Sequence, residues 1–341
     1  MARIDDVTGE LRRVPRAWLV TGGAGFIGSH LVEALLALGQ EVRVLDNFAT
    51  GSHANLDDVR ACAGAAATRL TVLEGDVVDP AVCAQACRGV SVVLHQAALG
   101  SVPRSLADPL ATHRANVDGF VQLLLAAKDA GVARFVYASS SSVYGDHPEL
   151  PKVEDRIGRP LSPYAASKLV DEVYARVYQT SFGVESVGLR YFNVFGPRQD
   201  PNGPYAAVIP TWVAALLRGQ PCTINGDGET SRDFCAVANA VQANLLAALA
   251  PKSATGEVYN VAFGVRTTLR ELFALLRDGL ARERPELAAV EPVLGPFRAG
   301  DVRHSLADIA KARTALGYQP TQDVRSGLAE ALPWYVARAR G

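Results

Sequence analysis

The sequence predicts an α/β protein with a doubly wound parallel sheet and a smaller α/β domain toward the C-terminus. Up to residue 140, short apolar runs alternate with longer stretches of helical periodicity, which is typical of βαβ units. The runs are apolar almost throughout, as expected of parallel strands that are buried on both faces. The expected strands are residues 18–22, 41–46, 70–76, 90–98, 134–140 and 184–194.

Helices are expected between these strands. IGSHLVEALLAL (27–38) and NVDGFVQLLLAAKDA (116–130) are each followed by a glycine, a residue that often ends a helix. A third helix is expected over residues 162–183, with Ser162 as its N-cap and Pro163 at its first position. This helix leads into the sixth strand.

The length of 341 residues favours two domains over one. Beyond residue 196 the chain becomes richer in Pro and Gly, and loops interrupt the apolar helices. We expect the sheet domain to cover residues 1–186, joined by elements from about 233–262. The second domain should take most of residues 187–341.

Composition excludes several classes of function. Lys and Arg number 34 against 35 Asp and Glu, and no basic run is present, so a nucleic-acid partner is not expected. No apolar stretch could span a membrane, and the N-terminus lacks the apolar core of a secretory signal, so we expect a cytoplasmic protein. Five cysteines without a CxxC pair and six histidines without ligand spacing predict reduced thiols and no metal.

A glycine-rich turn, TGGAGFIGSH (21–30), follows the first strand and opens the first helix. Gly22, Gly25 and Gly28 would let a pyrophosphate rest on the helix N-terminus, whose free N–H groups and dipole favour anions. Asp46, at the end of the second strand, could accept hydrogen bonds from the adenosine ribose but would repel a 2′-phosphate. The pattern predicts a Rossmann-type site for NAD, in preference to NADP. Asp76, after the third strand, lies well for the adenine side.

Tyr164 and Lys168 are four residues apart on the third helix, so their side chains project from the same face. A free phenol has a pKa of about 10, and a nearby ammonium and a positively charged nicotinamide would both favour its ionised form. The pair therefore suits a general base and the cation that activates it. The serine run 139–142 ends the fifth strand at the ligand-binding edge, where alternation alone does not separate Ser140 from Ser141.

These motifs resemble the extended short-chain dehydrogenase/reductase family of nucleotide-sugar enzymes. Within it the chain is most similar to bacterial UDP-N-acetylglucosamine 4-epimerases, over nearly its whole length. The resemblance implies that the enzyme interconverts UDP-N-acetylglucosamine and UDP-N-acetylgalactosamine through a 4-keto sugar, with NAD as cofactor and with UDP-glucose and UDP-galactose as further substrates. It is carried by residues 21–30, 45–51, 94–105, 139–148, 161–168, 189–203, 224–234 and 300–309.

The resemblance also assigns residues to each role. It implies that Ser140, Tyr164 and Lys168 are catalytic. For NAD it implies contacts from Gly22, Gly25, Phe26, Ile27, Gly28, Asp46, Asn47, Phe48, Thr50, Gly51, Asp76, Val77, Gln96, Ala97, Ala98, Asn116, Tyr164, Lys168 and Tyr191. For the UDP-sugar it implies contacts from Ser101, Ser140, Ser141, Ser142, Asn193, Ala207, Val208, Thr223, Asn225, Arg232, Arg298, Asp301 and Ser305.

Ser305 bears on the choice of sugar, because in this family a bulky residue at the corresponding position excludes an N-acetyl group and serine leaves room. The same epimerisation of the uronic acid, UDP-N-acetylglucosaminuronate, stays open, since Arg104 could meet a carboxylate at C6. A 4,6-dehydratase is less favoured, because related dehydratases carry Asp-Glu where this chain has Ser141 and Ser142. A non-catalytic NAD-sensing protein would need neither Tyr164 nor Lys168.

A homodimer is expected. The helical segments 116–130 and 162–183 are apolar on more than one side, and similar enzymes pair these helices into a four-helix bundle.

Overall fold

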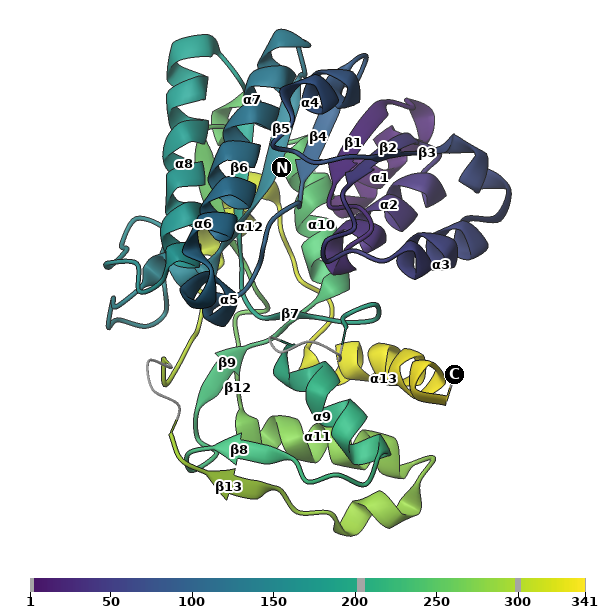
Figure 1. Cartoon of the computed structure of the whole chain (residues 1–341), viewed down its shortest axis with the longest axis vertical. Helices are drawn as coiled ribbons and strands as arrows, with labels where there is room; N and C mark the ends of the chain where they lie inside the picture. The colour runs from purple at the N-terminus through teal and green to yellow at the C-terminus, as the bar shows by residue number, and fades with distance from the viewer. Residues whose placement is uncertain (1–2, 201–205, 298–301, 341) are drawn as a thin grey trace.

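The computed structural model describes residues 3–200, 206–297 and 302–340. Within these ranges, seven parallel strands form the central sheet, in the order β11-β6-β5-β4-β1-β2-β3 (Figure 1). The order reverses at β1, which pairs with both β2 and β4, so the predicted doubly wound α/β fold is confirmed. The strands are β1 (Ala17–Thr21), β2 (Glu41–Asp46), β3 (Leu70–Glu74), β4 (Val92–His95), β5 (Arg134–Ser140), β6 (Ser186–Tyr191) and β11 (Glu257–Val261).

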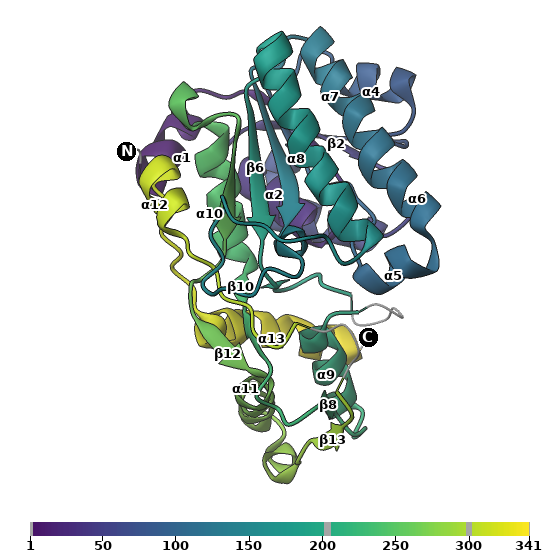
Figure 2. The same ribbon diagram turned by 90° about the vertical axis from the view of Figure 1, so that its left-hand side faces the viewer.

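Helices cover both faces of the sheet (Figure 2). On one face lie α1 (Ile4–Arg13), α2 (Phe26–Ala37), α3 (His53–Ala63), α10 (Val237–Ala248) and α12 (Ala310–Leu316). On the other lie α4 (Pro80–Cys87), α7 (Gly119–Asp129) and α8 (Pro163–Phe182), with the short α5 (Val102–Ala107), α6 (Pro109–His113) and π-helical η2 (Arg114–Asp118). The sheet therefore separates two apolar cores, one around Trp18 and Leu31 and the other around Leu19 and Phe120.

Local sequence accounts for the ends of these elements. The Ser162 hydroxyl accepts a hydrogen bond from the N–H of Ala165 at 3.1 Å, so α8 starts where its N-cap was predicted. Strand β4 is shorter than the expected 90–98, because residues 96–98 leave the sheet and turn along its carboxyl edge.

The N-terminal helix α1 packs against α10 through Val7 and Leu11. Gln40 fixes it in place: its amide donates to the Leu11 carbonyl and accepts from the Trp18 indole. The amide of Gln40 thus joins α1 to the first strand.

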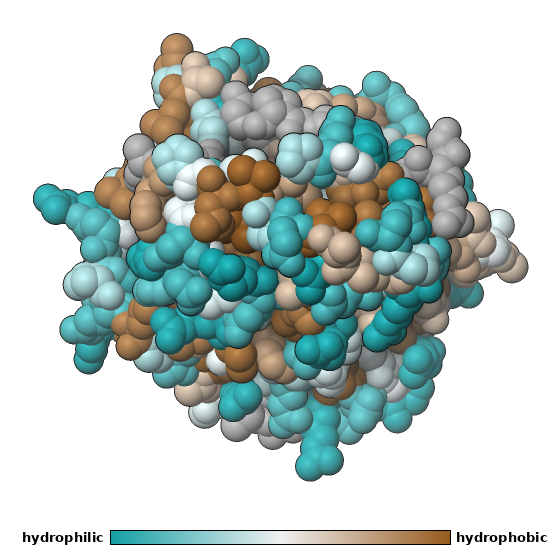
Figure 3. Space-filling model, turned by 90° about the horizontal axis from the view of Figure 1, so that it is seen from below, coloured by the Kyte–Doolittle hydropathy of each residue, from teal (hydrophilic) through white to brown (hydrophobic). Residues whose placement is uncertain are grey.

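A small domain forms around a third apolar core, which includes Trp212 and Phe273 (lower part of Figure 1). It contains α9 (Val208–Leu217), α11 (Leu269–Ala281), α13 (Val324–Arg340) and the strand pairs β8 (Thr223–Asn225) with β13 (Val293–Gly295) and β9 (Ser231–Asp233) with β12 (Arg266–Thr268). Figure 3 views this end, where brown patches lie between teal side chains. Val293, Leu294 and Phe297 are exposed on or beside β13.

The chain passes between the two domains several times. After β6 it enters the small domain through β7 (Val194–Phe195), returns through β10 (Cys235–Ala236) to α10 and β11, and leaves again for β12 and α11. The expected boundary after residue 186 coincides with the first residue of β6. Residues 187–191 lie in the sheet because they pair with both β5 and β11.

No helix of the described ranges has the length and apolar character needed to cross a bilayer.

Candidate active site

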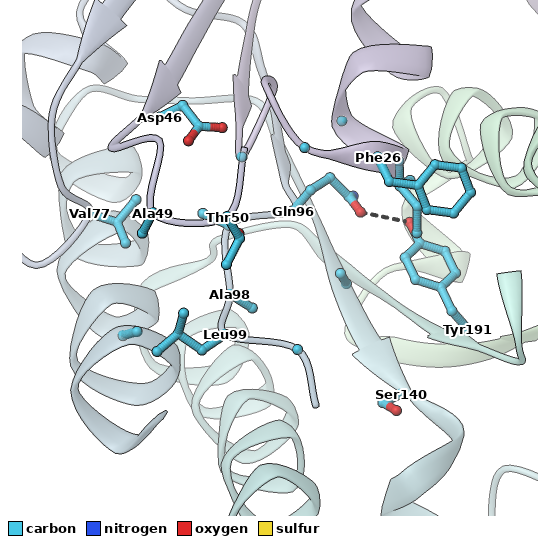
Figure 4. Close-up of a pocket in the computed structure, with 18 of the residues that line it drawn as sticks. Phe26, Asp46, Ala49, Thr50, Val77, Gln96, Ala98, Leu99, Ser140 and Tyr191 are labelled. Atoms are coloured by element: carbon cyan, nitrogen blue, oxygen red, sulfur yellow. Dashed lines mark hydrogen bonds between the residues drawn. The ribbon is translucent and has the colours of Figure 1, made fainter. Parts of the chain in front are cut away.

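A cavity of about 480 Å³ opens at the carboxyl ends of the strands, next to the point where the strand order reverses (Figure 4). Open α/β sheets bind their ligands at this place. Most residues predicted to bind the cofactor line it: Gly22, Gly25, Phe26, Ile27, Gly28, Asp46, Asn47, Thr50, Asp76, Val77, Gln96, Ala97, Ala98, Tyr164, Lys168 and Tyr191.

The glycine turn is shaped for a close approach of backbone to ligand. Gly22 has a φ of +67°, and a Cβ on Gly28 would lie 2.1 Å from the Gly22 carbonyl oxygen. Gly25, the N-cap of α2, offers no side chain to the first turn of the helix. The free N–H groups of that turn are therefore available to an anion, as a pyrophosphate requires.

Asp46 lines the cavity beside the glycine turn. One carboxylate oxygen accepts from the Ala24 N–H at 2.9 Å and the other from the Phe48 N–H at 2.8 Å. Burial raises the pKa of Asp46, against the lowering effect of these two N–H donors. Each oxygen keeps a further lone pair, so the group fits ribose hydroxyls and would repel a 2′-phosphate.

Three predicted cofactor residues lie outside the cavity lining. The Phe48 ring stacks on His53 with centroids 3.8 Å apart. A Cβ on Gly51 would be 3.0 Å from the Asp46 carboxylate, and the Asn116 amide accepts from the Leu99 N–H at 2.7 Å and donates to Ser167. These residues support the wall of the cavity.

A second carboxylate, that of Asp76, also lines the cavity. Asp76 accepts from the Asn47 side chain at 2.9 Å and from the Val78 N–H at 3.1 Å. Both bonds fix its orientation beside Val77, which also lines the cavity.

The opposite end is held by a network of neutral side chains. The Tyr191 hydroxyl donates to Gln96 at 3.2 Å (Figure 4). It also accepts from Asn244 at 2.7 Å, and Gln96 donates to Asn244. Burial raises the pKa of Tyr191 to about 12. Tyr191 therefore stays a neutral hydrogen-bond donor. The other phenol that lines the cavity is Tyr164, in the first turn of α8.

Tyr164, Lys168 and Ser140 line the same cavity. Lys168 lies one helical turn beyond Tyr164, and its ammonium donates to the Asp171 carboxylate at 3.2 Å. Of the serine run, Ser139 and Ser140 line the cavity, whereas Ser142 donates to the Ser140 hydroxyl at 2.9 Å. The structure thus brings a phenol, an ammonium and a hydroxyl to one wall, a set able to move a proton to and from an alcohol.

The residues predicted to meet the substrate are dispersed. Asn193 lines the cavity, with φ +30° and its amide on the Asp233 carbonyl. Ser101 caps α5 through the Arg104 N–H and lies outside the lining, whereas Gly100 and Arg104 are part of it. Ser141 begins η3 (Ser141–Tyr144), just past the cavity.

The other substrate candidates belong to the small domain. The Arg232 guanidinium donates to the Ser231 and Arg303 carbonyls, and the Ser305 N–H donates to Ser231, so β9 and the segment after residue 302 run together. The remaining positions are Ala207 and Val208 at the start of α9 and Thr223 and Asn225 on β8. Arg298 and Asp301 lie outside the described residues.

Sequence reasoning did not find two polar groups of this site. Gln199 lines the cavity, with its amide nitrogen on the Val194 carbonyl and its buried oxygen without a partner within the described residues. Asp171, buried behind Lys168, was not predicted either. Its position three residues after Lys168, on the same face of the helix, was the available signal.

Known proteins share this architecture over nearly the whole chain. The UDP-glucose 4-epimerase of Mycolicibacterium smegmatis is 37% identical over 319 residues, which are 93% of this chain and 97% of that protein. A solved UDP-N-acetylglucosamine 4-epimerase from Methanobrevibacter ruminantium, in complex with UDP-N-acetylmuramic acid, superposes with a TM-score of 0.87 at 38% identity, covering 95% of this chain and 99% of that one.

A second solved structure contains the cofactor. A mutant UDP-glucuronic acid 4-epimerase of Bacillus cereus, in complex with a fluorinated UDP-glucuronic acid and NAD, has a TM-score of 0.83 at 29% identity, covering 94% of this chain and 99% of that one. Residues 18–262 match the NAD dependent epimerase/dehydratase family. The glycine turn and Asp46 fit NAD as described above. The chain therefore belongs to the NAD dependent epimerase/dehydratase family, and its cofactor is NAD.

Proposed function

We propose that this protein is a UDP-sugar 4-epimerase and that it interconverts UDP-N-acetylglucosamine and UDP-N-acetylgalactosamine. One observation carries the proposal: Tyr164, Lys168 and Ser140 line the same cavity as the dinucleotide turn. The 4-epimerases among its relatives support the reaction class. The short side chain of Ser305 supports an acetylated sugar.

The side chains of the cavity have separate tasks in this reaction. Tyr164, as the phenolate, accepts the proton of the C4 hydroxyl, directly or through Ser140, and later returns it. The Lys168 ammonium favours that negative charge, and Ser142 orients Ser140 by donating to its oxygen. NAD, when bound, supplies the acceptor and donor of the C4 hydride. Between the two transfers the 4-keto sugar turns about its diphosphate linkage and presents its other face.

The small domain would hold the nucleotide part of the substrate. We assign the diphosphate to Arg232 and Arg298, since two guanidinium groups suit its charge. Asp301 would hold the uridine ribose. The uracil would lie near Ala207, Val208, Thr223 and Asn225, and the sugar near Ser101, Ser141, Asn193 and Ser305.

The uronic acid is the second candidate substrate. Arg104 lines the cavity and carries the positive charge that a C6 carboxylate would need. The relative from Bacillus cereus acts on such a sugar. The chain is a poor candidate for a dehydratase, because it has Ser141 and Ser142 where related dehydratases carry the Asp-Glu pair for the elimination of water.

Proton NMR of the anomeric region tests the substrate. Purified protein is incubated with UDP-N-acetylglucosamine, UDP-glucose or UDP-N-acetylglucosaminuronate, with and without added NAD. Conversion of the first to UDP-N-acetylgalactosamine supports the proposal. Conversion of the uronic acid alone would move the assignment to that sugar, and no conversion of any would leave an NAD-sensing role.

We also propose a homodimer formed through α6, α7 and α8. Leu110 of α6 is 80% exposed, and Val173 and Val177, four residues apart on α8, are 57% and 46% exposed. An apolar face of this kind is a candidate protein interface. Light scattering that gives the mass of one chain would refute it.

A further inference from the structure

A buried ion pair lies directly behind the proposed catalytic residues. Tyr164, Lys168 and Asp171 follow one another at positions i, i+4 and i+7 of α8, so they lie along one face of the helix. The Lys168 ammonium is 3.2 Å from one Asp171 oxygen, and the two side chains are 3% and 1% exposed. The other Asp171 oxygen has no hydrogen-bond partner within the described residues.

The neighbouring acids and bases do not replace Asp171 as the partner of Lys168. Glu172 accepts two hydrogen bonds from the Arg190 guanidinium of β6, both of 2.8 Å, and is thereby neutralised. From β4, His95 faces the pair, and burial together with the Lys168 charge lowers the pKa of His95 to about 3, so the ring is neutral.

Within the described ranges, the other elements packed against α8 bring no second buried carboxylate to Lys168. Tyr137 of β5 is buried and its pKa is raised well above the usual value by burial, and Arg104 of α5 is a cation. The charged side chains of α6, η2 and α7 face solvent or pair with one another: His113, Arg114, Asp118, Lys128 and Asp129. Among the described residues, Asp171 is thus the carboxylate within ion-pair distance of Lys168.

A buried ammonium without a counter-charge loses its proton readily, because burial disfavours the charged form. The role proposed for Lys168, to favour the Tyr164 phenolate, requires that it keep its charge at the pH of turnover. We propose that Asp171 is a positioning residue that keeps Lys168 protonated and holds its ammonium in place on the face of α8 that carries Tyr164. This inference rests on the proposed epimerase function.

Lysine-selective NMR of the NAD-bound protein tests the pair directly. The chain has only five lysines, at positions 128, 152, 168, 252 and 311, so a ¹³Cε-labelled sample gives few signals, and a Lys168→Met variant assigns the one of interest. The Asp171→Asn variant keeps the shape and an acceptor but removes the charge. In it the Lys168 signal should titrate at a pH lower by about one unit or more. The Asp171→Glu variant should restore much of the wild-type titration.

Glu172→Gln is the matched control, because it removes a buried carboxylate from the same helix that pairs with Arg190 instead. It should lower stability and leave the Lys168 titration in place. If Lys168 titrates alike in the wild type and Asp171→Asn, or shifts as much in Glu172→Gln, the proposal is overturned.

Kinetics add a second measurement. The alkaline limb of the kcat profile should move to lower pH in Asp171→Asn by the same amount as the lysine signal. A uniform loss of kcat without a shifted limb would indicate a merely structural role and contradict the proposal. An inactive wild type would refute the epimerase function, whereas the NMR titration would still report on the ion pair.

Discussion

The two halves of the site are built in different ways. The cofactor half lines one cavity with residues from consecutive strand ends and the turns that follow them. Of the candidates for the substrate half, Ser140 and Asn193 line that cavity, whereas the described candidates on α9, β8, β9 and the segment after residue 302 do not. A dinucleotide site is therefore specified by local backbone geometry, whereas the substrate half depends on the register between distant segments.

The largest expected effect is the loss of NAD binding when the backbone of the glycine turn is disturbed. Gly28→Ala should abolish NAD binding, because the new Cβ would lie 2.1 Å from the Gly22 carbonyl oxygen. Calorimetric titration with NAD measures this. Gly9→Ala is the control, since a Cβ there meets no atom within 4 Å. That change should keep NAD binding and add about 0.5–1 kcal/mol to the free energy of unfolding. Normal NAD binding by Gly28→Ala would remove the argument from backbone geometry.

Tyr164→Phe should separate chemistry from cofactor binding. We expect kcat to fall at least about 10²-fold, as for one positioned acid or base, with the affinity for NAD retained. The NMR assay of epimerisation measures the loss. Tyr174→Phe, on the same helix and 39% exposed, should leave turnover unchanged. Near-normal turnover in Tyr164→Phe would end the assignment of Tyr164 as the base.

The pH dependence of stability probes the interior beneath the cofactor half. His95 contacts the Thr21 hydroxyl at 2.7 Å, and its folded pKa of about 3 lies below the ordinary 6.5. The unfolded chain therefore binds an extra proton between these values. The contribution of His95 is complete above pH 6.5 and is lost toward pH 3, by about 1.4 kcal/mol per pH unit.

Urea unfolding at pH 7 and pH 5 measures this contribution. His95→Gln should lose less stability than the wild type over that interval, whereas His113→Gln, at the surface, should behave as the wild type does. Equal losses in His95→Gln and the wild type would show that His95 takes up no proton on unfolding.

The smallest effect concerns the substrate half. Ser305→Tyr should reduce turnover of UDP-N-acetylglucosamine about tenfold or more relative to UDP-glucose, because the ring would take the space of the acetamido group. The ratio of the two turnover rates is compared between the wild type and Ser305→Tyr, with UDP-glucose as the reference substrate in both. An unchanged ratio would place the acetamido group elsewhere.

The same contrast explains what the sequence predicts. Asp46 was predictable because, in this fold, a carboxylate at the end of the second strand lies beside the glycine turn. Gln199 was not, because the segment after β7 reaches the cavity only through the packing of two domains. Strand β11 was expected only as part of residues 233–262, since a single edge strand that far along the chain carries no local sign of its partner, β6.

The repeated passage of the chain between the domains limits how such an enzyme can be rebuilt. The small domain is not one continuous segment: α9 with β8 and β9, then β12 with α11 and β13, and finally α13 enter it separately, while α10, β11 and α12 between them stay with the sheet. A chimera with the small domain of a relative would therefore need three separate grafts, each matched to the sheet domain at its junctions. This architecture favours new specificities by single substitutions over exchange of a whole domain.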